Sequence, residues 1–574
     1  MPSPESPTRR PDRARRHDRD PLPPPDQALV GDSGRSLDPH TAVAVRGVSP
    51  RGTLYVGTHL LVSAQRDRAE TLDRLNEVAE QLGWEVVPDE RYACCRLAAA
   101  PGRPDRSRGH GHGHHHGGTG HGDTGHDECG CDHAAPLGLE RFLVRTRSGV
   151  AATAPDGWTL LQHARARFGT DSLHGVGLDH LVQSTPVGST PMESSNPMES
   201  SNPMESSNPV PGPSPAVASY GRLGTGGRQP LSFVGRPPHR RADRDVAGRR
   251  PVVAVLDTGC GTHSWLEGVV GQLTLDGEPI GDTDPATDPE VTGNVTGALD
   301  GELDPLAGHG TFIAGLVHQA CPDADILTGR VVAADGRIIE SEWLDAIIRV
   351  AELARRHAAG EEGGHPVDVL NLSMGYYHET PEDVLFDPVL AGVLETLGRC
   401  GTTVVCSVGN DATSRPFYPA AFAPWSDGKG GRPADADCVP VVSVGALNPD
   451  GRSAALFSNA GSWVRHYVPG ASVFSTIPAF QGGRQAMAST TAFGMSRTSL
   501  DPDDFTGGFA LWSGTSFAAP LVAGQLAAQL VDHLPEDTEE VGRPVARSWS
   551  AVSTVTGIEA PGTRPVAPGA ADRS

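Results

Sequence analysis

Five consecutive apolar residues, Val252 to Leu256, restrict the fold of this 574-residue chain more than any other segment. An apolar run of this length, followed directly by the turn sequence Asp257-Thr258-Gly259, predicts a buried strand. Because both faces of such a strand are apolar, both must be covered, as happens in a parallel sheet between two layers of helices. The run therefore favours an α/β fold.

Helical and strand patterns alternate after this run, which supports the same fold class. The longest helical pattern, 340–357, repeats apolar residues at spacings of three and four. The other predicted helices are 311–320 and 384–400, and the other predicted strands are 324–332, 367–374, 402–407 and 439–446. We predict one domain over 251–534, with a mostly parallel sheet, helices on both faces and right-handed crossovers.

A smaller unit precedes this domain, and we call residues 41–185 the N-terminal module. Its pattern is β-α-β followed by β-α-β, which predicts an α+β, ferredoxin-like fold. The predicted strands are 54–62, 84–87, 141–146 and 178–183, and the predicted helices are 66–82 and 157–168. A His-rich insertion, 109–133, interrupts the module with eight His residues and with Cys129 and Cys131. Its many glycines favour a flexible insertion over a metal site of fixed geometry, so we place no metal there.

Three further segments are predicted to lack a packed structure. Residues 1–40 and 535–574 are polar, Pro-rich tails. Residues 186–250 form a predicted linker with three copies of Pro-Met-Glu-Ser-Ser-Asn at 191–208, where a proline every six residues blocks both helix and interior strand. The linker ends in the pairs Arg240-Arg241 and Arg249-Arg250, which we interpret as exposed charges, either sites of proteolytic cutting or ordinary linker residues.

Composition excludes some classes of function. The formal net charge of −23 argues against nucleic acid as a partner. The N-terminus has no apolar segment typical of a secretory signal. The uncharged run 509–531 contains Ser, Thr, Gln and Pro, which favour a buried helix over a membrane span. We predict a cytoplasmic protein without a membrane partner, with export by a non-standard route as the alternative.

Four polar residues stand at the ends of predicted elements and together suggest acyl-transfer chemistry. Asp257 ends the first apolar strand, His309 begins a helix, Asn410 follows a strand, and Ser516 begins the uncharged helix. Each alone has an ordinary interpretation, such as a helix cap or a turn residue. Together they supply a nucleophile, a base, an acid that orients the base, and an oxyanion donor, at sheet edges where such groups gather.

The motifs around these residues resemble the catalytic domain of subtilisin-like serine proteases, the subtilases. The matching stretches are Ala254-Val255-Leu256-Asp257-Thr258-Gly259, Gly308-His309-Gly310-Thr311-Phe312-Ile313-Ala314-Gly315, Ser407-Val408-Gly409-Asn410 and Ser513-Gly514-Thr515-Ser516-Phe517-Ala518-Ala519-Pro520. The order Asp, His, Ser is the order found in subtilisin. The resemblance covers about 251–531 and implies a serine endopeptidase acting on proteins or peptides.

The resemblance also implies roles for individual residues. Ser516 would be the nucleophile, His309 the general acid and base, Asp257 its orienting partner, and Asn410 an oxyanion donor. Ser373, Met374 and Gly375 would pair with the extended substrate backbone, and Ser407, Val408 and Gly409 would line its binding site. No cofactor is required for this chemistry, and a structural Ca²⁺ is compatible with the family but cannot be placed.

Some features depart from the family pattern. The N-terminal module resembles only in layout the propeptides that fold and inhibit subtilases, and we predict that it acts as an intramolecular inhibitor. A long stretch between Asp257 and His309 holds acidic residues that we interpret as a solvated loop, not a Ca²⁺ site, namely Asp282, Asp284, Asp288 and Glu290. A second insertion, 481–506, is interpreted as a lid or rim. The alternative function is a non-enzymatic protein that binds metal through the His-rich insertion or keeps only the protease scaffold.

Overall fold

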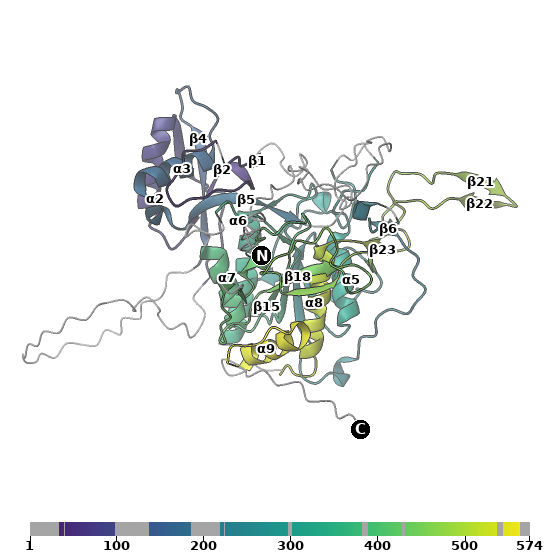
Figure 1. Ribbon diagram of the computed structural model, residues 1–574. Coiled ribbons are helices and arrows are strands. Elements are labelled where there is room, and N and C mark those ends of the chain that lie inside the picture. The colour runs from purple at the N-terminus through teal and green to yellow at the C-terminus, as the bar shows by residue number, and fades with distance from the viewer. Residues whose placement is uncertain are drawn as a thin grey trace, which may run out of the picture.

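The computed structural model describes residues 34–39, 41–97, 137–184, 219–222, 224–296, 301–380, 388–426, 431–535 and 543–562. It contains a large α/β domain and, against one side of it, the smaller N-terminal module, seen at the upper left in Figure 1. The His-rich insertion and the hexapeptide repeats lie outside the described residues. No helix in the described ranges is long and apolar enough to span a membrane.

A seven-stranded parallel sheet forms the centre of the larger domain. Its order is β19-β18-β15-β13-β7-β11-β8, and every neighbouring pair is parallel. The strands are β7 (Val252–Asp257), β8 (Val270–Gln272), β11 (Asp325–Arg330), β13 (Val369–Leu372), β15 (Thr403–Ser407), β18 (Val442–Leu447) and β19 (His466–Pro469). The apolar run Val252–Leu256 is thus a central strand, as predicted.

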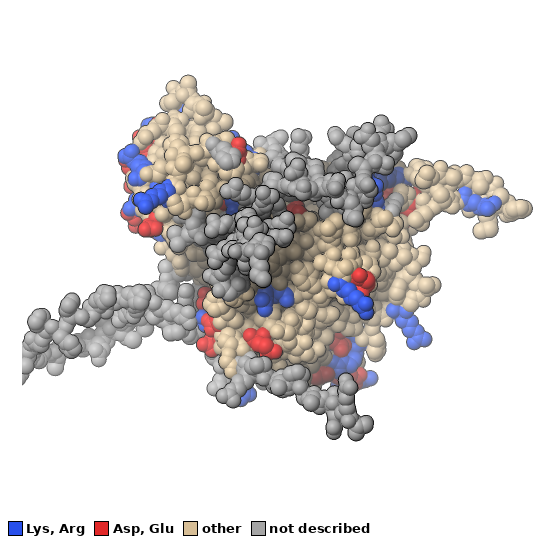
Figure 2. Space-filling view, viewed as in Figure 1, with Lys and Arg blue, Asp and Glu red and all other residues tan. Residues whose placement is uncertain are grey.

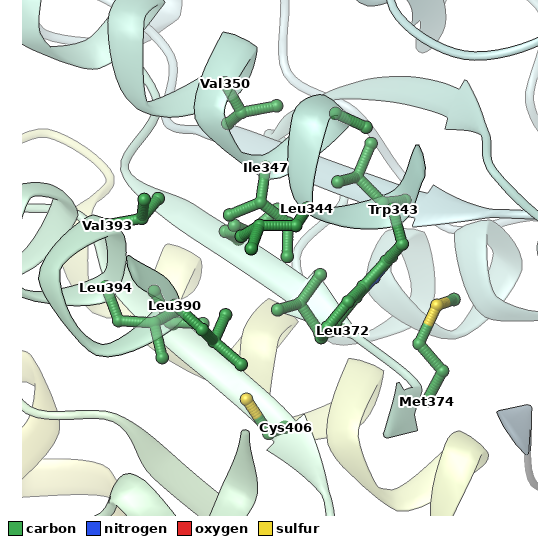
Figure 3. Close-up of a cluster of buried hydrophobic side chains, with 14 of the residues drawn as sticks. Trp343, Leu344, Ile347, Val350, Leu372, Met374, Leu390, Val393, Leu394 and Cys406 are labelled. Carbon is green, nitrogen blue, oxygen red and sulfur yellow. The ribbon is translucent and has the colours of Figure 1, made fainter. Parts of the chain in front are cut away.

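Helices cover both faces of this sheet, and alternate residues of β7 divide between the two layers. Ala254 and Leu256 belong to the core under α6 (Glu340–Ala359) and α7 (Pro388–Arg399), whereas Val253 and Val255 pack with α5 (His309–Ala320) and α8 (Thr515–Leu530). Figure 3 shows side chains of α6 and α7 converging on the strand residues Leu372 and Cys406. Burial of β7 on both sides explains why its first five residues are all apolar.

Shorter strands complete the larger domain. They are β6 (Gln229–Pro230), β9 (Thr274–Leu275), β10 (Glu278–Pro279), β12 (Ile338–Ile339), β14 (Met374–Gly375), β16 (Trp425–Ser426), β17 (Gly431–Arg432), β20 (Val473–Thr476), β21 (Ser489–Ala492), β22 (Met495–Thr498) and β23 (Phe509–Trp512). The insertion 481–506 contains the hairpin β21–β22, which projects from the domain at the right of Figure 1 and is mostly uncharged (Figure 2). The uncharged run 509–531 divides into β23 and the buried helix α8.

The N-terminal module has the predicted ferredoxin-like arrangement. Its elements are β1 (Gly34–Ser36), β2 (Leu54–Ser63), α2 (Arg68–Ala79), β3 (Trp84–Pro88), β4 (Leu139–Thr146), α3 (Gly157–Phe168) and β5 (Val176–Ser184). The four long strands follow the antiparallel order β5-β2-β4-β3. Both helices pack on one face of this sheet, over a core that includes Trp84, Phe142 and Trp158. On the surface above α2 and α3, basic and acidic side chains alternate (Figure 2).

The module and the larger domain share both a sheet and a core. Strand β5 pairs antiparallel with β12 and, at its end, with β14. Leu61 and Leu139 of the module lie in the same buried cluster as Trp343 of α6. Tyr92 donates a hydrogen bond to the backbone oxygen of Ser341, at 2.8 Å. The two units are therefore packed directly on each other.

The segment 224–250 corrects the prediction of exposed basic pairs in a linker. Arg249 donates two hydrogen bonds to Asp368, at 2.6 and 2.8 Å, and Arg250 is buried between Asp243 and Asp323. These arginines fix the chain at the entrance to β7, so they are not the free charges of a mobile linker. The pattern of neighbouring arginines could not reveal Asp323 and Asp368, which lie more than 70 residues further along the chain.

The polar region after residue 534 also differs from the predicted tail. Residues 543–556 form helix α9 (Arg543–Thr556), which packs against α8 and buries Val545, Trp549 and Val552. These three apolar residues recur at helical spacing of four and three, a signal that the surrounding polar residues obscured. Ser548 adds a hydrogen bond to the backbone oxygen of Gly401.

Candidate active site

Asp257 and His309 form a buried pair at the edge of the parallel sheet. Asp257 is the last residue of β7, and His309 is the first residue of α5. The Nδ1 atom of His309 lies 2.6 Å from Oδ1 of Asp257, and neither side chain is exposed. The backbone amide of Thr258 donates a second bond to the same carboxylate oxygen, at 2.8 Å. The carboxylate is thus held so that it orients the imidazole through Nδ1.

The other nitrogen of this imidazole, Nε2, is not held by the carboxylate. Among the described residues, His309 Nε2 has no hydrogen-bond partner although it is buried. The ring packs at 5.2 Å from the ring of Phe517, the residue that follows Ser516, and at 5.7 Å from the ring of Trp512. An imidazole fixed by a carboxylate on one nitrogen and open on the other has the geometry of a general base.

Glycine allows the turn that delivers His309 to the helix start. Gly308 is the N-cap of α5 and has φ of 80°, in the left-handed region. A Cβ atom at this position would also lie 2.6 Å from Ile477, so a larger residue meets both strain and a clash. The Gly-His-Gly sequence is therefore a local requirement of this turn.

Glu290 closes the N-terminus of the same helix and was not predicted there. It is buried, and it accepts hydrogen bonds from the amide of Gly310 at 2.9 Å, from Thr311 Oγ1 at 2.5 Å and from Thr258 Oγ1. Burial, with the nearby charge of Asp257 adding to it, raises the pKa of Glu290 to about 7. This finding corrects the interpretation of Glu290 as part of a solvated loop, whereas Asp282 and Asp284 are exposed as expected.

Ser516 lies in the first turn of α8, next to the predicted substrate strand. Its Oγ atom is 3.5 Å from the backbone oxygen of Ser373, and Ser373 Oγ in turn donates to the backbone oxygen of Ser516, at 2.9 Å. Asn371 Nδ2 donates to Ser373 Oγ at 3.0 Å. These bonds tie the strand segment 371–375 to the helix that carries Ser516.

Asn410 reaches the same turn from the opposite side. Its Oδ1 atom accepts a hydrogen bond from the backbone amide of Thr515, at 3.0 Å. The amide group is therefore oriented by the residue that precedes Ser516. A side-chain amide beside a serine at a helix N-terminus is placed to donate to an oxyanion.

The segment Ser407–Gly409 leads from β15 to Asn410 and depends on a residue that the motifs did not include. Asn459 donates to the backbone oxygen of Val408 at 2.7 Å and accepts from the amide of Asp411 at 3.0 Å. Gly409 has φ of 92°, and a Cβ atom there would lie 2.5 Å from Asn459. Asn459 thus holds the turn that positions Asn410.

The predicted substrate strand already has a partner in this structure. Met374 and Gly375 form β14, which pairs antiparallel with Ser184 and Gln183 of the N-terminal module. Ser373, Met374 and Gly375 are buried, and Met374 packs in the core near Trp343 (Figure 3). The last strand of the module therefore lies where an extended peptide would add to β14.

The structure brings the predicted site residues together and adds two more. Asp257, His309, Ser516 and Asn410 surround one turn, with 373–375 and 407–409 beside it. Glu290 and Asn459 were missed because each lies in a loop with no periodic pattern and contacts the site only through tertiary structure. The one hint for Glu290 was its place in an acidic stretch between Asp257 and His309.

Residues 248–549, more than half of the chain, match the sequence profile of the Subtilase family, peptidase S8. The intracellular serine protease of Paenibacillus polymyxa is 28% identical over 296 residues, covering 49% of this chain and 66% of that protein. The major intracellular serine protease of Bacillus subtilis (strain 168) is 25% identical over 300 residues, covering 50% and 69%. Among solved structures, fervidolysin from Fervidobacterium pennivorans aligns with a TM-score of 0.40 and 17% identity, over 85% of this chain and 57% of that one.

The chain thus spans about two thirds of the length of the two bacterial relatives. The matched segment contains the central sheet, the helices on both of its faces and the buried Asp257–His309 pair beside Ser516. Because this profile match extends over more than half of the sequence, the chain belongs to the subtilase family.

Proposed function

We propose that the protein is a serine endopeptidase that hydrolyses peptide bonds through Asp257, His309 and Ser516. The observation that carries this proposal is the buried pair between His309 Nδ1 and Asp257 Oδ1, 2.6 Å long, next to the turn that bears Ser516. A carboxylate in this position selects the tautomer with the proton on Nδ1, so that Nε2 can accept a proton. Family membership supports the same reaction class.

The reaction proceeds in two halves. Ser516 Oγ attacks the carbonyl carbon of the scissile peptide bond while its proton passes to His309 Nε2, and the carbonyl oxygen becomes an oxyanion near Asn410. The C–N bond then breaks, His309 returns the proton to the leaving amine, and an acyl ester remains on Ser516. Water attacks this ester with His309 as the base, which releases the acid and restores the serine. All groups in this scheme belong to the chain, the substrate and water.

Ser516 reaches this geometry by a side-chain rotation. Its Oγ atom contacts the Ser373 backbone oxygen at 3.5 Å, whereas His309 Nε2 is without a partner in the described part of the structure. Catalytic hydrogen bonds often form only when substrate is bound. Rotation of Oγ towards Nε2 would complete the triad.

The substrate is proposed to be an extended peptide that adds to β14. Residues 373–375 would pair with its backbone, a form of strand addition. The segment 407–409 consists of small or apolar residues, so it favours apolar or uncharged substrate side chains. A cleavage profile on a peptide library tests this preference, and a strong selection for acidic or basic side chains would contradict it.

The N-terminal module is proposed to act as an intramolecular inhibitor. Strand β5 occupies the antiparallel partner position of β14, with Ser184 opposite Met374. It also binds the adjacent helix, since Asp179 accepts hydrogen bonds from Ser341 N and Oγ, both at 2.9 Å. A peptide substrate and β5 would compete for the same edge.

Removal of the module would require a cut between residues 185 and 218. From residue 224 the chain is attached to the larger domain, with Arg249 bound to Asp368 and Arg241 bound to Asp323. A cut beyond these contacts would remove a segment that supports β7. The proposal therefore assigns self-cleavage to the region that contains the hexapeptide repeats.

A fluorophosphonate probe tests the catalytic assignment. We expect labelling of wild type at Ser516, no labelling of Ser516→Ala, and loss of labelling in His309→Ala with the fold retained by circular dichroism. His365→Ala, which changes an exposed histidine, is the matched control and keeps full labelling. A wild type without labelling, or labelling that persists in His309→Ala, contradicts the proposal and favours a non-enzymatic scaffold.

Self-processing is tested separately by incubating purified wild type beside Ser516→Ala. We expect wild type to lose the N-terminal module through a cut before residue 219 and the variant to stay full length. N-terminal sequencing of the larger fragment locates the cut. If both proteins stay intact while wild type reacts with the probe, the enzyme assignment stands and the self-processing proposal fails.

A further inference from the structure

The interface between the N-terminal module and the larger domain contains a buried group of imidazoles and carboxylates that the proposed mechanism does not use. His180 comes from β5, His378 and Glu379 follow β14, and Glu340 is the first residue of α6. All four are at most 2% exposed. Charged and chemically reactive groups are rarely buried together without a specific role.

Three of these side chains converge on one point. His180 Nε2 lies 2.8 Å from Glu379 Oε2, and His378 Nδ1 lies 3.3 Å from the same oxygen. The ligating atoms of His180, His378 and Glu379 all lie within 4.8 Å of one another. Two ligands of a tetrahedral zinc ion are about 3.3 Å apart, as Zn–N bonds of about 2.0 Å require. The group has the dimensions of a metal site.

Glu340 orients the ring of His180. Glu340 Oε2 lies 2.5 Å from His180 Nδ1 and 3.1 Å from the backbone amide of His180, which donates to it. A histidine that binds a metal through one nitrogen usually donates its other ring proton to a carboxylate. Glu340 is in this position, and it leaves Nε2 of His180 as the ligating atom.

His378 places a second imidazole beside Glu379, with Nδ1 3.3 Å from its carboxylate. The backbone amide of Thr380 donates to His378 Nδ1 at 3.0 Å, which keeps that nitrogen unprotonated. An unprotonated nitrogen cannot donate to the carboxylate oxygen 3.3 Å away. A metal ion at this point would bind His378 Nδ1 in exchange for its bond from Thr380 and would neutralise the carboxylate.

Glu379 and the neighbouring space provide the remaining ligands. In the described structure, Glu379 Oε1 has no hydrogen-bond partner, although the residue is fully buried. A cavity of about 20 Å³ is lined by His180, His378 and Glu340 together with apolar residues of the module. This volume holds one water molecule. Two imidazoles, one carboxylate and a water from this cavity would supply the four ligands that Zn²⁺ prefers.

We propose that His180, His378 and Glu379 bind a divalent first-row cation of the Zn²⁺ class, with Glu340 as the residue that orients His180. Because His180 belongs to the module and the other two ligands to the larger domain, the ion ties the two units together. Its binding displaces the proton that His180 Nε2 shares with Glu379, and this proton is released to solvent. Any effect of the ion on regulation rests on the proposed inhibitory role of the module, whereas the binding site itself does not.

The sequence contains a competing binder, the His-rich insertion 109–133. Its eight histidines and two cysteines would bind zinc at many positions, so a metal count on the natural chain would not report on the interface. The test therefore uses the full chain with Ser516→Ala, which prevents self-cleavage, and with the His and Cys residues of 110–133 changed to Asn and Ser. We call this protein the parent.

The experiment measures zinc bound to the parent after gel filtration and the zinc affinity in competition with a chromophoric chelator. We expect one zinc per chain. Glu379→Gln is expected to lose at least 100-fold in affinity and Glu340→Gln about 10- to 100-fold, as for residues that support a ligand. Glu342→Gln, an exposed carboxylate on the same helix, is the control and keeps the parental affinity.

Two results would overturn the site: a parent that binds no zinc in stoichiometric amounts, and a Glu379→Gln variant that binds as tightly as the parent. Should either variant fail to fold, X-ray absorption of zinc on the folded parent decides. Two imidazoles with oxygen donors support the site, whereas any other ligand set refutes it. Because the parent lacks Ser516, no outcome depends on peptidase activity.

Discussion

Two buried histidines, His309 and His180, each lie close to a carboxylate and yet differ in what they can do. His309 Nδ1 is 2.6 Å from Asp257, and its Nε2 has no partner in the described structure. His180 is held on both nitrogens, at 2.5 Å from Glu340 and 2.8 Å from Glu379. One ring has a nitrogen that faces no carboxylate, whereas both nitrogens of the other ring face one.

The comparison shows that a buried histidine–carboxylate contact does not by itself identify a catalytic pair. Burial disfavours the charged ring of His180, but Glu340 and Glu379 outweigh it and raise its pKa to about 10. Such a ring holds a cation, either a proton or a metal, between two parts of the chain. A catalytic ring has to exchange its proton, and it needs a nearby group that exchanges with it. In the proposed mechanism, Ser516 provides that group for His309.

The largest expected effect comes from removing the imidazole of His309. His309→Ala should lower kcat by a factor on the order of 10⁶, because the serine loses its base. Steady-state cleavage of a peptide substrate measures the loss, with circular dichroism as the check of folding. His365→Ala, on the surface, should leave kcat unchanged. A loss of less than about 100-fold in His309→Ala would mean that His309 is not the base.

The next largest effect concerns His180, which lies between two carboxylates, and it should appear in the free energy of unfolding. Glu340→Ala leaves a buried cation with one carboxylate instead of two and should cost about 3 to 5 kcal/mol in the free energy of unfolding. Urea unfolding of the Ser516→Ala chain in the presence of a chelator measures it. Glu342, 60% exposed on the same helix, is the control, and Glu342→Ala should change stability by less than about 0.5 kcal/mol. Equal effects of the two variants would show that Glu340 does not stabilise a buried cation at His180.

Asn410 is proposed to stabilise the charge that develops beside His309 during the reaction. Asn410→Ala should lower kcat by about 10² to 10³, which corresponds to about 3 to 4 kcal/mol of transition-state stabilisation, with little change in KM. Kinetics of the same peptide substrate separate the two constants. Asn448→Ala, in a surface loop, serves as the control. A variant that raises KM alone would assign Asn410 to substrate binding.

The smallest expected effect is a pH dependence of stability that arises from Glu290, near His309. The pKa of Glu290 is raised from 4.5 to about 7 in the folded protein, so the folded state binds this proton more tightly than the unfolded chain. Its contribution to stability is complete below pH 4.5 and is lost as the pH rises through 7. The loss amounts to about 3 kcal/mol at most.

Glu290→Gln removes this titration. In the Ser516→Ala background, the variant should gain stability relative to its parent as the pH rises from about 5 to about 8. Urea unfolding at the two pH values measures the difference between the proteins. A difference that is constant with pH would show that Glu290 is ionised throughout. Wild-type activity between the same pH values then shows whether the Thr258 hydroxyl, which contacts both Glu290 and Asp257, passes the change on to the site.

Much of the fold followed from local pattern. The apolar run of β7 predicted a strand covered on both faces, and the two core clusters contain alternate residues of that strand. The module was predicted from four strand and two helix patterns, and the observed strand order agrees with the ferredoxin-like fold. These signals are periodic and span several residues, so they can be recognised without tertiary information.

The rest depended on contacts that sequence does not encode locally. Arg249 and Arg250 read as exposed linker charges because their partners, Asp368 and Asp323, are distant in the chain. Glu290 read as a solvated acid because nothing nearby marks it as the cap of α5. The helix α9 read as a tail since only three of its residues are large and buried in a polar context. Motifs located Asp257, His309, Asn410 and Ser516, but not Asn459, whose role is to fix a turn.

Ser373 has a consequence for where a substrate would be cut. Its hydroxyl donates to the backbone oxygen of Ser516, and the next two residues form β14. One side chain therefore fixes the distance along the chain direction between the pairing edge and the nucleophile. A peptide that pairs with β14 would be cleaved at a set number of residues from its first pairing contact. The cut position would thus depend on backbone register as well as on the side chains that 407–409 accept.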